Sequence, residues 1–178
     1  GIVAAEVVAR AALDGHTLLI APVGTMVFNP VLFAKLPYDP EKSFAMITMV
    51  ADYPLYLSVS SKLPVKSLKE LIAHAKANPN QANYASTSGV FQLTNELFKL
   101  KTNTQFEMIP FKSSNEMIQG VLTGQAMIGF IDPTALMPQV KAGTIRILAM
   151  TGAKRVPDLP DVPTMAEAGV EGVVVSGY

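Results

Sequence analysis

A short polar turn near the middle of this sequence is well suited to bind a charged small molecule. Ser86, Thr87, Ser88 and Gly89 follow a predicted strand at 83–85 and precede a predicted amphipathic helix. Free backbone N–H groups at a helix N-terminus lie beside the positive end of the helix dipole, and together they bind carboxylate or phosphate. A serine in this turn could instead serve only as the N-cap of its own helix. The turn therefore indicates either an anion site or an ordinary helix start.

Three further polar loops stand where predicted strands end. They contain Thr25, the pair Lys112 and Ser113, and Asp132. In parallel α/β sheets ligands bind beyond the carboxyl ends of the strands, so we expect these loops and the polar turn to converge on one cleft. Lys112 could equally be a solvated surface lysine, and Asp132 could be only the cap of the next helix.

Strands and helices are predicted to alternate along most of the chain, which favours an α/β fold with mainly parallel sheets. Capping boxes at 67–70, 113–116 and 164–167 mark three helix starts, and further helices are predicted at 3–11, 29–36, 135–141 and after the polar turn. The predicted strands lie at 17–21, 44–50, 55–60, 83–85, 106–109, 126–131 and 145–150.

The composition excludes several kinds of function. The formal net charge of the 178 residues is zero and no Lys/Arg cluster occurs, so nucleic acids and anionic membranes are poor partners. The absence of cysteine excludes thiol and disulfide chemistry. His16 and His74 are expected at solvated positions, and no His/Asp/Glu group has the spacing of metal ligands. No catalytic or nucleotide-binding motif is present, so we predict no cofactor.

A series of short motifs spans nearly the whole chain. They are DGHTLL at 14–19, NPVLFAKLPYDP at 29–40, LPVKSLKEL at 63–71, NYAS at 83–86, IPFK at 109–112, KAG at 141–143, TGAKR at 151–155 and LPDVPTMAEAG at 159–169. In this order the motifs resemble those of the solute-binding receptors of tripartite tricarboxylate transporters, which are Bug-type periplasmic proteins.

The resemblance implies an α/β, type II periplasmic-binding-protein-like fold, with two lobes of mainly parallel sheets joined by hinge strands. It places an incomplete first lobe at 1–52 and 151–178 and a second lobe at 53–150, with hinge crossings at 55–60 and 145–150. It also implies a small carboxylate ligand, no catalysis, periplasmic localisation, and the permease subunits of a membrane transporter as partners.

The sequence departs from the family pattern at several points. The family's opening strand and its Pro/Gly-rich loop would lie before Gly1 and its closing segment after Tyr178, so the chain looks cut at both ends. The family's Pro-Tyr-Lys-Gly pattern occurs as Pro-Phe-Lys-Ser at 110–113, and the loop at 87–90 looks shorter than in many relatives. An intact receptor is expected to be a monomer, whereas a fragment with exposed sheet edges could oligomerise.

These features predict a receptor that holds a small organic acid between two lobes. The polar turn would hold one carboxylate, Thr25 would meet the ligand on closure, and Asp132 would accept a hydrogen bond from the ligand or from a water. Two alternatives stay open: a carboxylic-acid lyase or isomerase that uses Lys112 and Asp132, and a truncated remnant that binds nothing. The predicted ligand-binding residues are Thr25, Ser86, Thr87, Ser88, Gly89, Gln92, Thr94, Lys112, Ser113 and Asp132.

Overall fold

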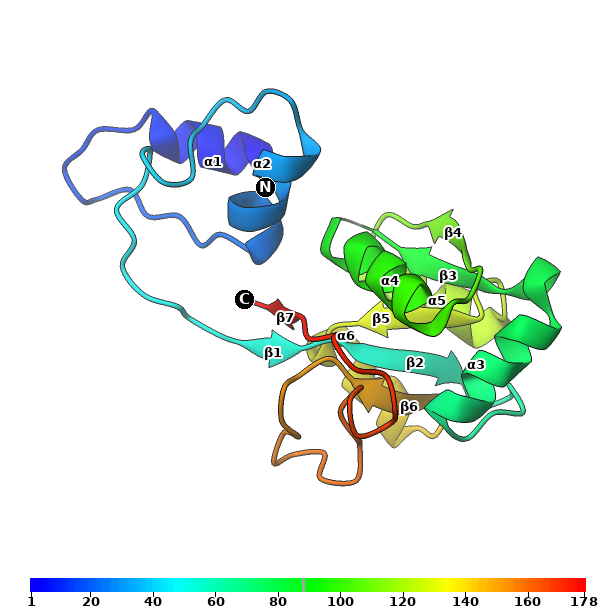
Figure 1. Cartoon of the computed structure of the whole chain (residues 1–178). Coiled ribbons are helices and arrows are strands. Elements are labelled where there is room, and N and C mark those ends of the chain that lie inside the picture. Colours follow the sequence, from blue (N-terminus) through cyan, green and yellow to red (C-terminus); the bar gives the residue numbers. More distant parts are fainter. Residues whose placement is uncertain (88) are drawn as a thin grey trace. The chain divides into compact units, whose positions relative to one another are not determined.

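The chain divides into two compact units (Figure 1). A computed structural model describes residues 1–87 and 89–178. The first unit comprises Gly1–Asp52 with Gly177–Tyr178, and the second comprises Tyr53–Ser176.

The second unit is built on a five-stranded sheet with the order β4-β3-β5-β2-β6 (Figure 1). β3 is parallel to β4 and β5, whereas β2 is antiparallel to β5 and β6. Four strands therefore run in one direction and β2 runs against them, so the sheet is mainly parallel, as the sequence predicted. The strands are β2 (Tyr56–Ser60), β3 (Asn83–Ser86), β4 (Glu107–Pro110), β5 (Ile128–Ile131) and β6 (Ile145–Met150).

Local capping signals fix the helices of this unit. Ser67 Oγ accepts a hydrogen bond from the Glu70 amide, and Asp132 caps a helix whose first residue is a proline. Gly124 adopts a left-handed conformation (φ 80°) that ends another helix. The helices are α3 (Leu68–Ala77), the short 3₁₀ helix η2 (Pro79–Gln81), α4 (Gly89–Thr102), α5 (Ser114–Thr123) and α6 (Pro133–Lys141).

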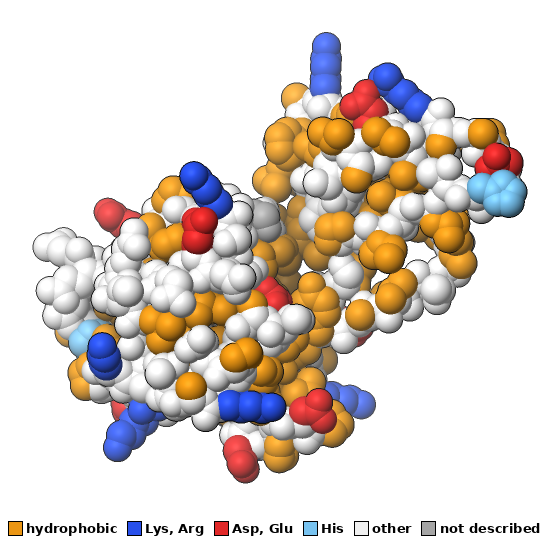
Figure 2. Space-filling model, turned by 180° about the vertical axis from the view of Figure 1, so that it is seen from behind, with side chains coloured by type: hydrophobic (Ala, Val, Ile, Leu, Met, Phe, Trp, Pro, Cys, Tyr) orange, Lys and Arg blue, Asp and Glu red, His pale blue; other side chains and the backbone are white. Residues whose placement is uncertain are grey.

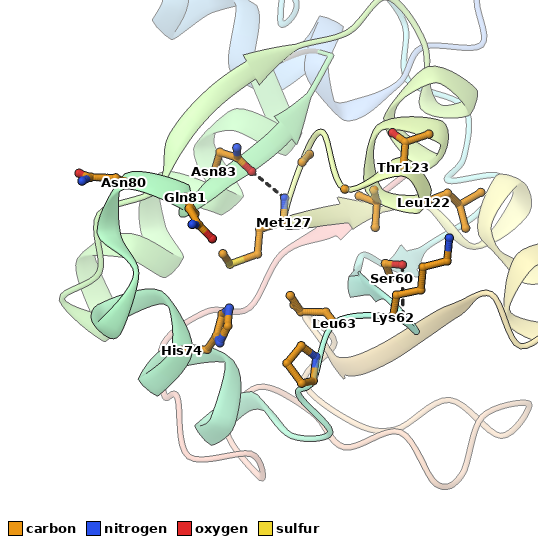
Figure 3. Close-up of a pocket in the computed structure, with 14 residues that line it drawn as sticks. Ser60, Lys62, Leu63, His74, Asn80, Gln81, Asn83, Leu122, Thr123 and Met127 are labelled. Carbon is orange, nitrogen blue, oxygen red and sulfur yellow. Dashed lines mark hydrogen bonds between the residues drawn. The ribbon is translucent and has the colours of Figure 1, made fainter.

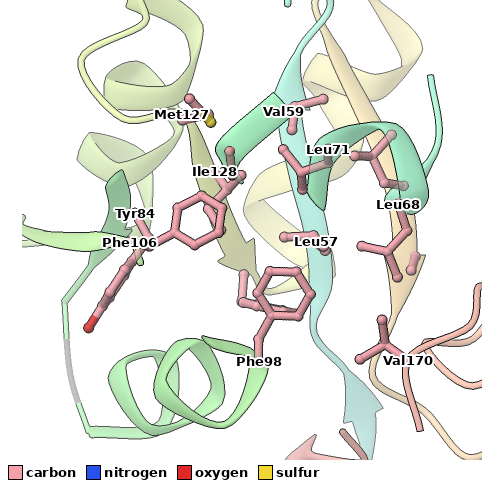
Figure 4. Packing of buried hydrophobic residues seen from close by; sticks show 14 of the residues in the cluster. Leu57, Val59, Leu68, Leu71, Tyr84, Phe98, Phe106, Met127, Ile128 and Val170 are labelled. Atoms are coloured by element: carbon pink, nitrogen blue, oxygen red, sulfur yellow. The ribbon is translucent and has the colours of Figure 1, made fainter. Parts of the chain in front are cut away.

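The core lies on both faces of the sheet. One cluster joins Leu57 of β2 to Leu71 of α3 and Phe98 of α4 (Figure 4), and the other joins Tyr56 of β2 to Met117 of α5. Side chains of successive strand residues point to opposite faces, which explains why the neighbours Tyr56 and Leu57 belong to different clusters. Helices α3 and α4 thus cover one face, and α5 covers the other.

Residues 151–176 are grouped with the second unit and Gly177–Tyr178 with the first, whereas the sequence analysis assigned all of 151–178 to the first lobe. Thr151 Oγ1 accepts a hydrogen bond from the Leu55 amide at 2.9 Å, and the Met165 amide donates to the Met150 carbonyl at 2.8 Å. Met165 and Val173 are buried in the cluster that contains Leu57. This packing holds the segment against β2 and β6.

The helix predicted after the third capping box is absent. Thr164 and Glu167 form both hydrogen bonds of the box, with the Glu167 amide donating to Thr164 Oγ1 and the Thr164 amide to Glu167 Oε2. The prediction of a helix is nevertheless wrong, because the chain only turns there. Gly169 (φ 91°) and Gly172 (φ 77°) adopt left-handed conformations directly afterwards.

The first unit contains three short helical segments and a small core. These segments are α1 (Ile2–Ala9), the π-helix η1 (Gly24–Phe28) and α2 (Asn29–Leu32). Two further short strands, β1 (Tyr53–Pro54) and β7 (Ser176–Gly177), pair with each other. The helix predicted to reach residue 36 ends at Leu32, since Phe33 is extended. The buried residues of this unit are Ala5, Val23, Thr25, Tyr38 and Gly177.

The strands predicted at 17–21 and 44–50 do not form, so these two predictions are wrong. Neither segment makes a backbone hydrogen bond to a described residue. A strand is stabilised by its neighbours in a sheet, and within the described part of the chain these segments have none. Their apolar side chains, including Leu18 and Ile47, are exposed, and hydrophobic atoms gather on the surface of this unit (Figure 2).

Candidate ligand-binding site

Three of the polar loops lie at one edge of the sheet in the second unit. β3 is the central strand of three neighbouring parallel strands, β4, β3 and β5, so their carboxyl ends point the same way. Ser86 is paired with Pro110, and the Phe111 amide donates to the Ser86 carbonyl at 2.8 Å. The register thus brings the loop that follows Ser86 and the loop of Lys112 side by side. Asp132 directly follows β5 at the same edge.

Ser86 is the most informative residue at this edge. It is the last residue of β3, and its side chain is only 3% exposed. Its hydroxyl oxygen is buried and has no hydrogen-bond partner among residues 1–87 and 89–178. An unpartnered buried hydroxyl costs about 1–3 kcal/mol, so such a group at the carboxyl end of a strand suggests a partner from outside the protein.

The N-terminus of α4 follows Ser86 after a short turn. Gly89 is the first residue of the 14-residue helix, and the amides of its first turn have no intrahelical partners. Thr87 is half-buried in the turn, and Gln92 is exposed in the first turn of the helix. The prediction for Ser88 lies outside the described residues. The helix N-terminus and the Ser86 hydroxyl are therefore close in the chain at one end of β3.

Thr94, one of the predicted ligand-binding residues, uses its hydroxyl proton within its own helix. The residue is buried, and its Oγ1 donates to the Val90 carbonyl at 2.7 Å. A threonine in the middle of a helix commonly donates to the carbonyl four residues earlier. Its proton is thus used within α4.

Asn95 is a buried polar residue that the sequence analysis missed. Its Nδ2 donates to the Phe91 carbonyl at 2.8 Å, and its Oδ1 is buried without a partner in the described part of the chain. An asparagine on the apolar face of a helix, four residues after Phe91 and three before Phe98, was a visible signal for such a group. Asn95 and Ser86 are the two residues found with a buried unpartnered side-chain oxygen.

The loop of Lys112 is shaped by a capping box. Ser113 Oγ accepts from the Glu116 amide at 3.2 Å, and Glu116 Oε2 accepts from the Lys112 amide at 3.0 Å. Lys112 and Ser113 are both exposed. The backbone amide of Lys112 and the hydroxyl of Ser113 form the hydrogen bonds at the start of α5, whereas the Lys112 side chain is solvated. The Lys112 side chain can add positive charge to this edge.

Asp132 combines a structural role with an electrostatic one. Its Oδ1 accepts from the Ala135 amide at 3.2 Å, which makes it the N-cap of α6. Burial raises the pKa of the Tyr53 phenol, and the negative charge of Asp132 raises it further. The sequence analysis missed Tyr53, which lies in β1, directly before β2. Because β2 runs antiparallel to β5, β2 starts at the edge where β5 ends. A protonated phenol and a carboxylate therefore stand beyond β5.

Thr25 belongs to the first unit and is buried there. Its carbonyl accepts from the Tyr38 hydroxyl at 2.6 Å, and its amide donates to the Pro22 carbonyl at 2.8 Å. Its side chain packs against Gly1, where an added Cβ would collide with Thr25 Oγ1. The predicted contact of Thr25 with a ligand stays a prediction.

A groove of about 580 Å³ lies at the other edge of the sheet (Figure 3). It is formed where β2 ends and where β3 and β5 begin, and Lys62, His74 and Met127 line it. The Asn83 side chain in this groove accepts from the Met127 amide at 2.6 Å. Among the described residues that line the groove, no polar side chain is both buried and without a hydrogen-bond partner. The groove differs in this respect from the edge that carries Ser86.

No helix among residues 1–87 and 89–178 is long and apolar enough to cross a membrane. Within the same ranges, no group of three or more His, Asp or Glu side chains could hold a metal ion.

Solved structures define the class of fold. The solved structure of R. palustris Rpa4515 with adipate is 34% identical to this chain in sequence and has a TM-score of 0.92. The match covers 100% of this chain and 60% of that chain. MatC from Rhodopseudomonas palustris with bound malate is 28% identical, with a TM-score of 0.85 over 99% of this chain and 60% of that chain. The periplasmic binding protein BugD is 29% identical to this chain and has a TM-score of 0.86. This match covers 97% of this chain and 58% of BugD. The chain has the α/β fold of periplasmic binding proteins.

The sequence model of one protein family, the tripartite tricarboxylate transporter family receptor, matches residues 1–178. The chain belongs to this family. A curated relative, the UPF0065 protein in the gbd 5' region of Cupriavidus necator, is 36% identical over 180 residues, which cover 100% of this chain and 54% of the relative. The chain spans about half the length of the curated relatives it matches.

Proposed function

We propose that the chain is part of a solute-binding receptor that captures a small organic acid with two carboxylates and delivers it to the permease of a tripartite transporter. The family supports the receptor role, and the solved relatives with adipate and with malate support the ligand class. The receptor works in the periplasm, as the name of the solved relative BugD suggests, and it performs no catalysis.

The Ser86 hydroxyl carries this proposal. It is buried, lacks a protein partner among the described residues, and lies at the shared edge of three parallel strands directly before the N-terminus of α4. A carboxylate at this point accepts from the hydroxyl and from the first amides of α4. Hydrogen bonds to a charged acceptor are worth about 1.5–3 kcal/mol each, so a few of them give micromolar binding of about −8 kcal/mol.

Lys112 and Asp132 favour different chemical groups of the ligand. The ammonium group of Lys112 favours the second carboxylate of the ligand, and the Asp132 carboxylate accepts from a ligand hydroxyl such as that of malate. Thr25, from the first unit, completes the site when the receptor closes over the ligand.

Thermal denaturation with adipate and with malate tests the proposal. Either acid at about 100 times its Kd stabilises a binding protein by about 2.7 kcal/mol, which raises the melting temperature by several degrees. We expect the Ser86→Ala variant to lose this shift while its melting temperature without ligand stays close to that of the parent chain, because the hydroxyl has no protein partner to lose.

The matched control is Ser60→Ala. Ser60 is also a buried serine of the same sheet, but it lies at the other edge and its Oγ accepts from the Lys62 amide. This variant should keep the full ligand-induced shift. No shift of the parent chain with either acid at millimolar concentration, or an equal shift in Ser86→Ala, would contradict the proposal.

A further inference from the structure

Thr151 joins two segments of the second unit that are far apart in the sequence. The residue directly follows β6, and it is fully buried. Its amide donates to the Leu55 carbonyl at 2.9 Å, and its carbonyl accepts from the Val175 amide at 3.1 Å. Its hydroxyl accepts from the Leu55 amide at 2.9 Å and donates to the Val175 carbonyl. The hydrogen bonds of this one threonine therefore hold both Leu55 and Val175.

The hydroxyl completes a connection that the backbone alone does not make. A residue has one backbone N–H and one backbone C=O, and those of Thr151 already have the Leu55 carbonyl and the Val175 amide as partners. The Leu55 amide and the Val175 carbonyl then need a side chain that accepts and donates at once. A hydroxyl does both, whereas a carboxylate only accepts and an ammonium group only donates. Leu55 is 1% exposed, so loss of the hydroxyl would leave its amide buried without this acceptor.

These hydrogen bonds lie where the chain passes between its two units. The units divide between residues 52 and 53 and again between residues 176 and 177. Leu55 directly follows β1 and Val175 directly precedes β7, and β1 and β7 pair with each other (Figure 1). Both connecting segments therefore leave the second unit beside a residue that Thr151 holds.

Thr151 also stands at the edge of the sheet that carries the candidate site. β2 is antiparallel to both β5 and β6, so β5 and β6 run in the same direction and end at one edge. Asp132 directly follows β5 at this edge, and Thr151 directly follows β6. Leu55 leads into β2, which lies between these two strands. A hold on Leu55 therefore acts on Tyr53 of β1, whose phenol is close enough to Asp132 for that charge to raise its pKa.

We propose that Thr151 is a positioning residue for ligand binding. Its hydroxyl fixes both connecting segments to the end of β6, and through Leu55 it sets the place of Tyr53 at the edge of the candidate site. Without the hydroxyl these segments sample arrangements in which the site is not assembled, and the apparent affinity falls with the fraction of molecules that stay competent. The effect on affinity rests on the receptor function proposed above, whereas the effect on the segments does not.

Hydrogen exchange followed by NMR tests the hold on the segments without any ligand. Thr151→Val keeps nearly the same shape and removes the hydroxyl, so we expect the Leu55 amide to exchange about tenfold faster relative to the Ala85 amide of β3. A general loss of stability would accelerate both amides alike. Thr151→Ser retains a hydroxyl and should restore slow exchange of the Leu55 amide. An unchanged Leu55 amide in Thr151→Val would overturn the proposal.

Calorimetric titration with adipate and with malate tests the effect on the site. Thr151→Val should raise the Kd about fivefold, and Thr151→Ser should restore it. The matched control is Thr102→Val, because Thr102 is also a buried threonine but its hydroxyl donates to the Phe98 carbonyl within α4. The control should keep the Kd within about twofold of the parent value. A faster Leu55 amide with an unchanged Kd in Thr151→Val would show that the hydroxyl holds the segments without positioning the site, which refutes the proposal.

Failure of the receptor function gives a different result from failure of this proposal. A parent chain that binds neither acid removes the receptor function, and exchange of the Leu55 amide then decides alone whether Thr151 fixes the segments. If Thr151→Val does not fold, the parent chain gives the answer. Its Thr151 hydroxyl proton should appear as a slowly exchanging NMR resonance, because it is buried and bonded to the Val175 carbonyl. A hydroxyl proton that exchanges with water too fast to be observed would contradict the hold.

Discussion

The two units carry similar strand signals in their sequences but use them differently. In the second unit the predicted strands at 55–60, 83–85, 126–131 and 145–150 are all paired in one sheet. In the first unit the predicted strands at 17–21 and 44–50 are as apolar, but they are exposed and pair with no strand among residues 1–87 and 89–178. An apolar run can therefore form a strand, but it does so only where neighbouring strands are available to pair with it.

Matched leucine truncations should give the largest difference between the units. Leu57 is fully buried in β2, whereas Leu18 is 69% exposed in the first unit. We expect Leu57→Ala to reduce the free energy of unfolding of its unit by about 2–5 kcal/mol, because it leaves a cavity between the sheet and α4. Leu18→Ala should change that of its own unit by less than about 0.5 kcal/mol.

Hydrogen exchange resolved for peptides of each unit is the appropriate measurement, since one melting temperature for the whole chain would combine the two. A loss from Leu18→Ala as large as that from Leu57→Ala would show that the first unit buries Leu18 in solution. The comparison between a paired and an unpaired region would then no longer hold.

The helices of the second unit were predictable because their signals are local. The capping boxes of α3 and α5 and the left-handed Gly124 lie within a few residues of the helix ends they define. The box at Thr164 and Glu167 shows the limit of this reasoning. Both of its hydrogen bonds form, but a capping box marks a start and cannot supply the helical turns that must follow it.

The candidate site was predictable only where it depends on strand ends. The sequence placed Ser86, Lys112 and Asp132 after strands, and parallel pairing brings these ends to one edge. It could not show that the hydroxyl of Thr94 is used within α4, because Thr94 has the same helical spacing as a donor that faces a ligand. Tyr53 was missed because its proximity to Asp132 depends on the antiparallel direction of β2.

Removal of a helix cap should give the second largest difference between the units. Ser67 caps α3 with its side chain, whereas the N-caps of α1 and α2 in the first unit form no side-chain hydrogen bond. We expect Ser67→Ala to lower the stability of the second unit by about 1 kcal/mol, and Ser67→Thr to restore most of it, because threonine also accepts from the Glu70 amide. Urea denaturation followed by far-UV circular dichroism measures both. Equal losses in the two variants would mean that packing of the serine, and not its hydrogen bond, supports α3.

An ion pair of the second unit should give the smallest effect, visible only as a pH dependence. Glu96 accepts from the Tyr84 hydroxyl at 2.7 Å and from Lys99 Nζ at 2.8 Å, while Glu6 in the first unit pairs with the exposed Arg10. Partial burial raises the pKa of Glu96, but the hydrogen bonds from Lys99 and Tyr84 outweigh it and hold this pKa below its usual value. A carboxylate with a lowered pKa stabilises the folded state above the ordinary pKa of glutamate, and this contribution is lost as the pH falls through the lower, folded-state value.

We therefore expect Glu96→Gln to flatten the loss of stability of the second unit between about pH 5 and pH 3, by on the order of 0.5 kcal/mol, since the Glu96 side chain is 45% exposed and solvent screens the pair. Glu107→Gln is the control, because it removes the same charge from an exposed position of β4 that takes part in neither hydrogen bond. Urea denaturation at a series of pH values compares the two variants with the parent chain. If Glu107→Gln flattened the acid limb as much as Glu96→Gln, the net charge of the unit and not the Tyr84–Glu96–Lys99 network would govern its acid stability.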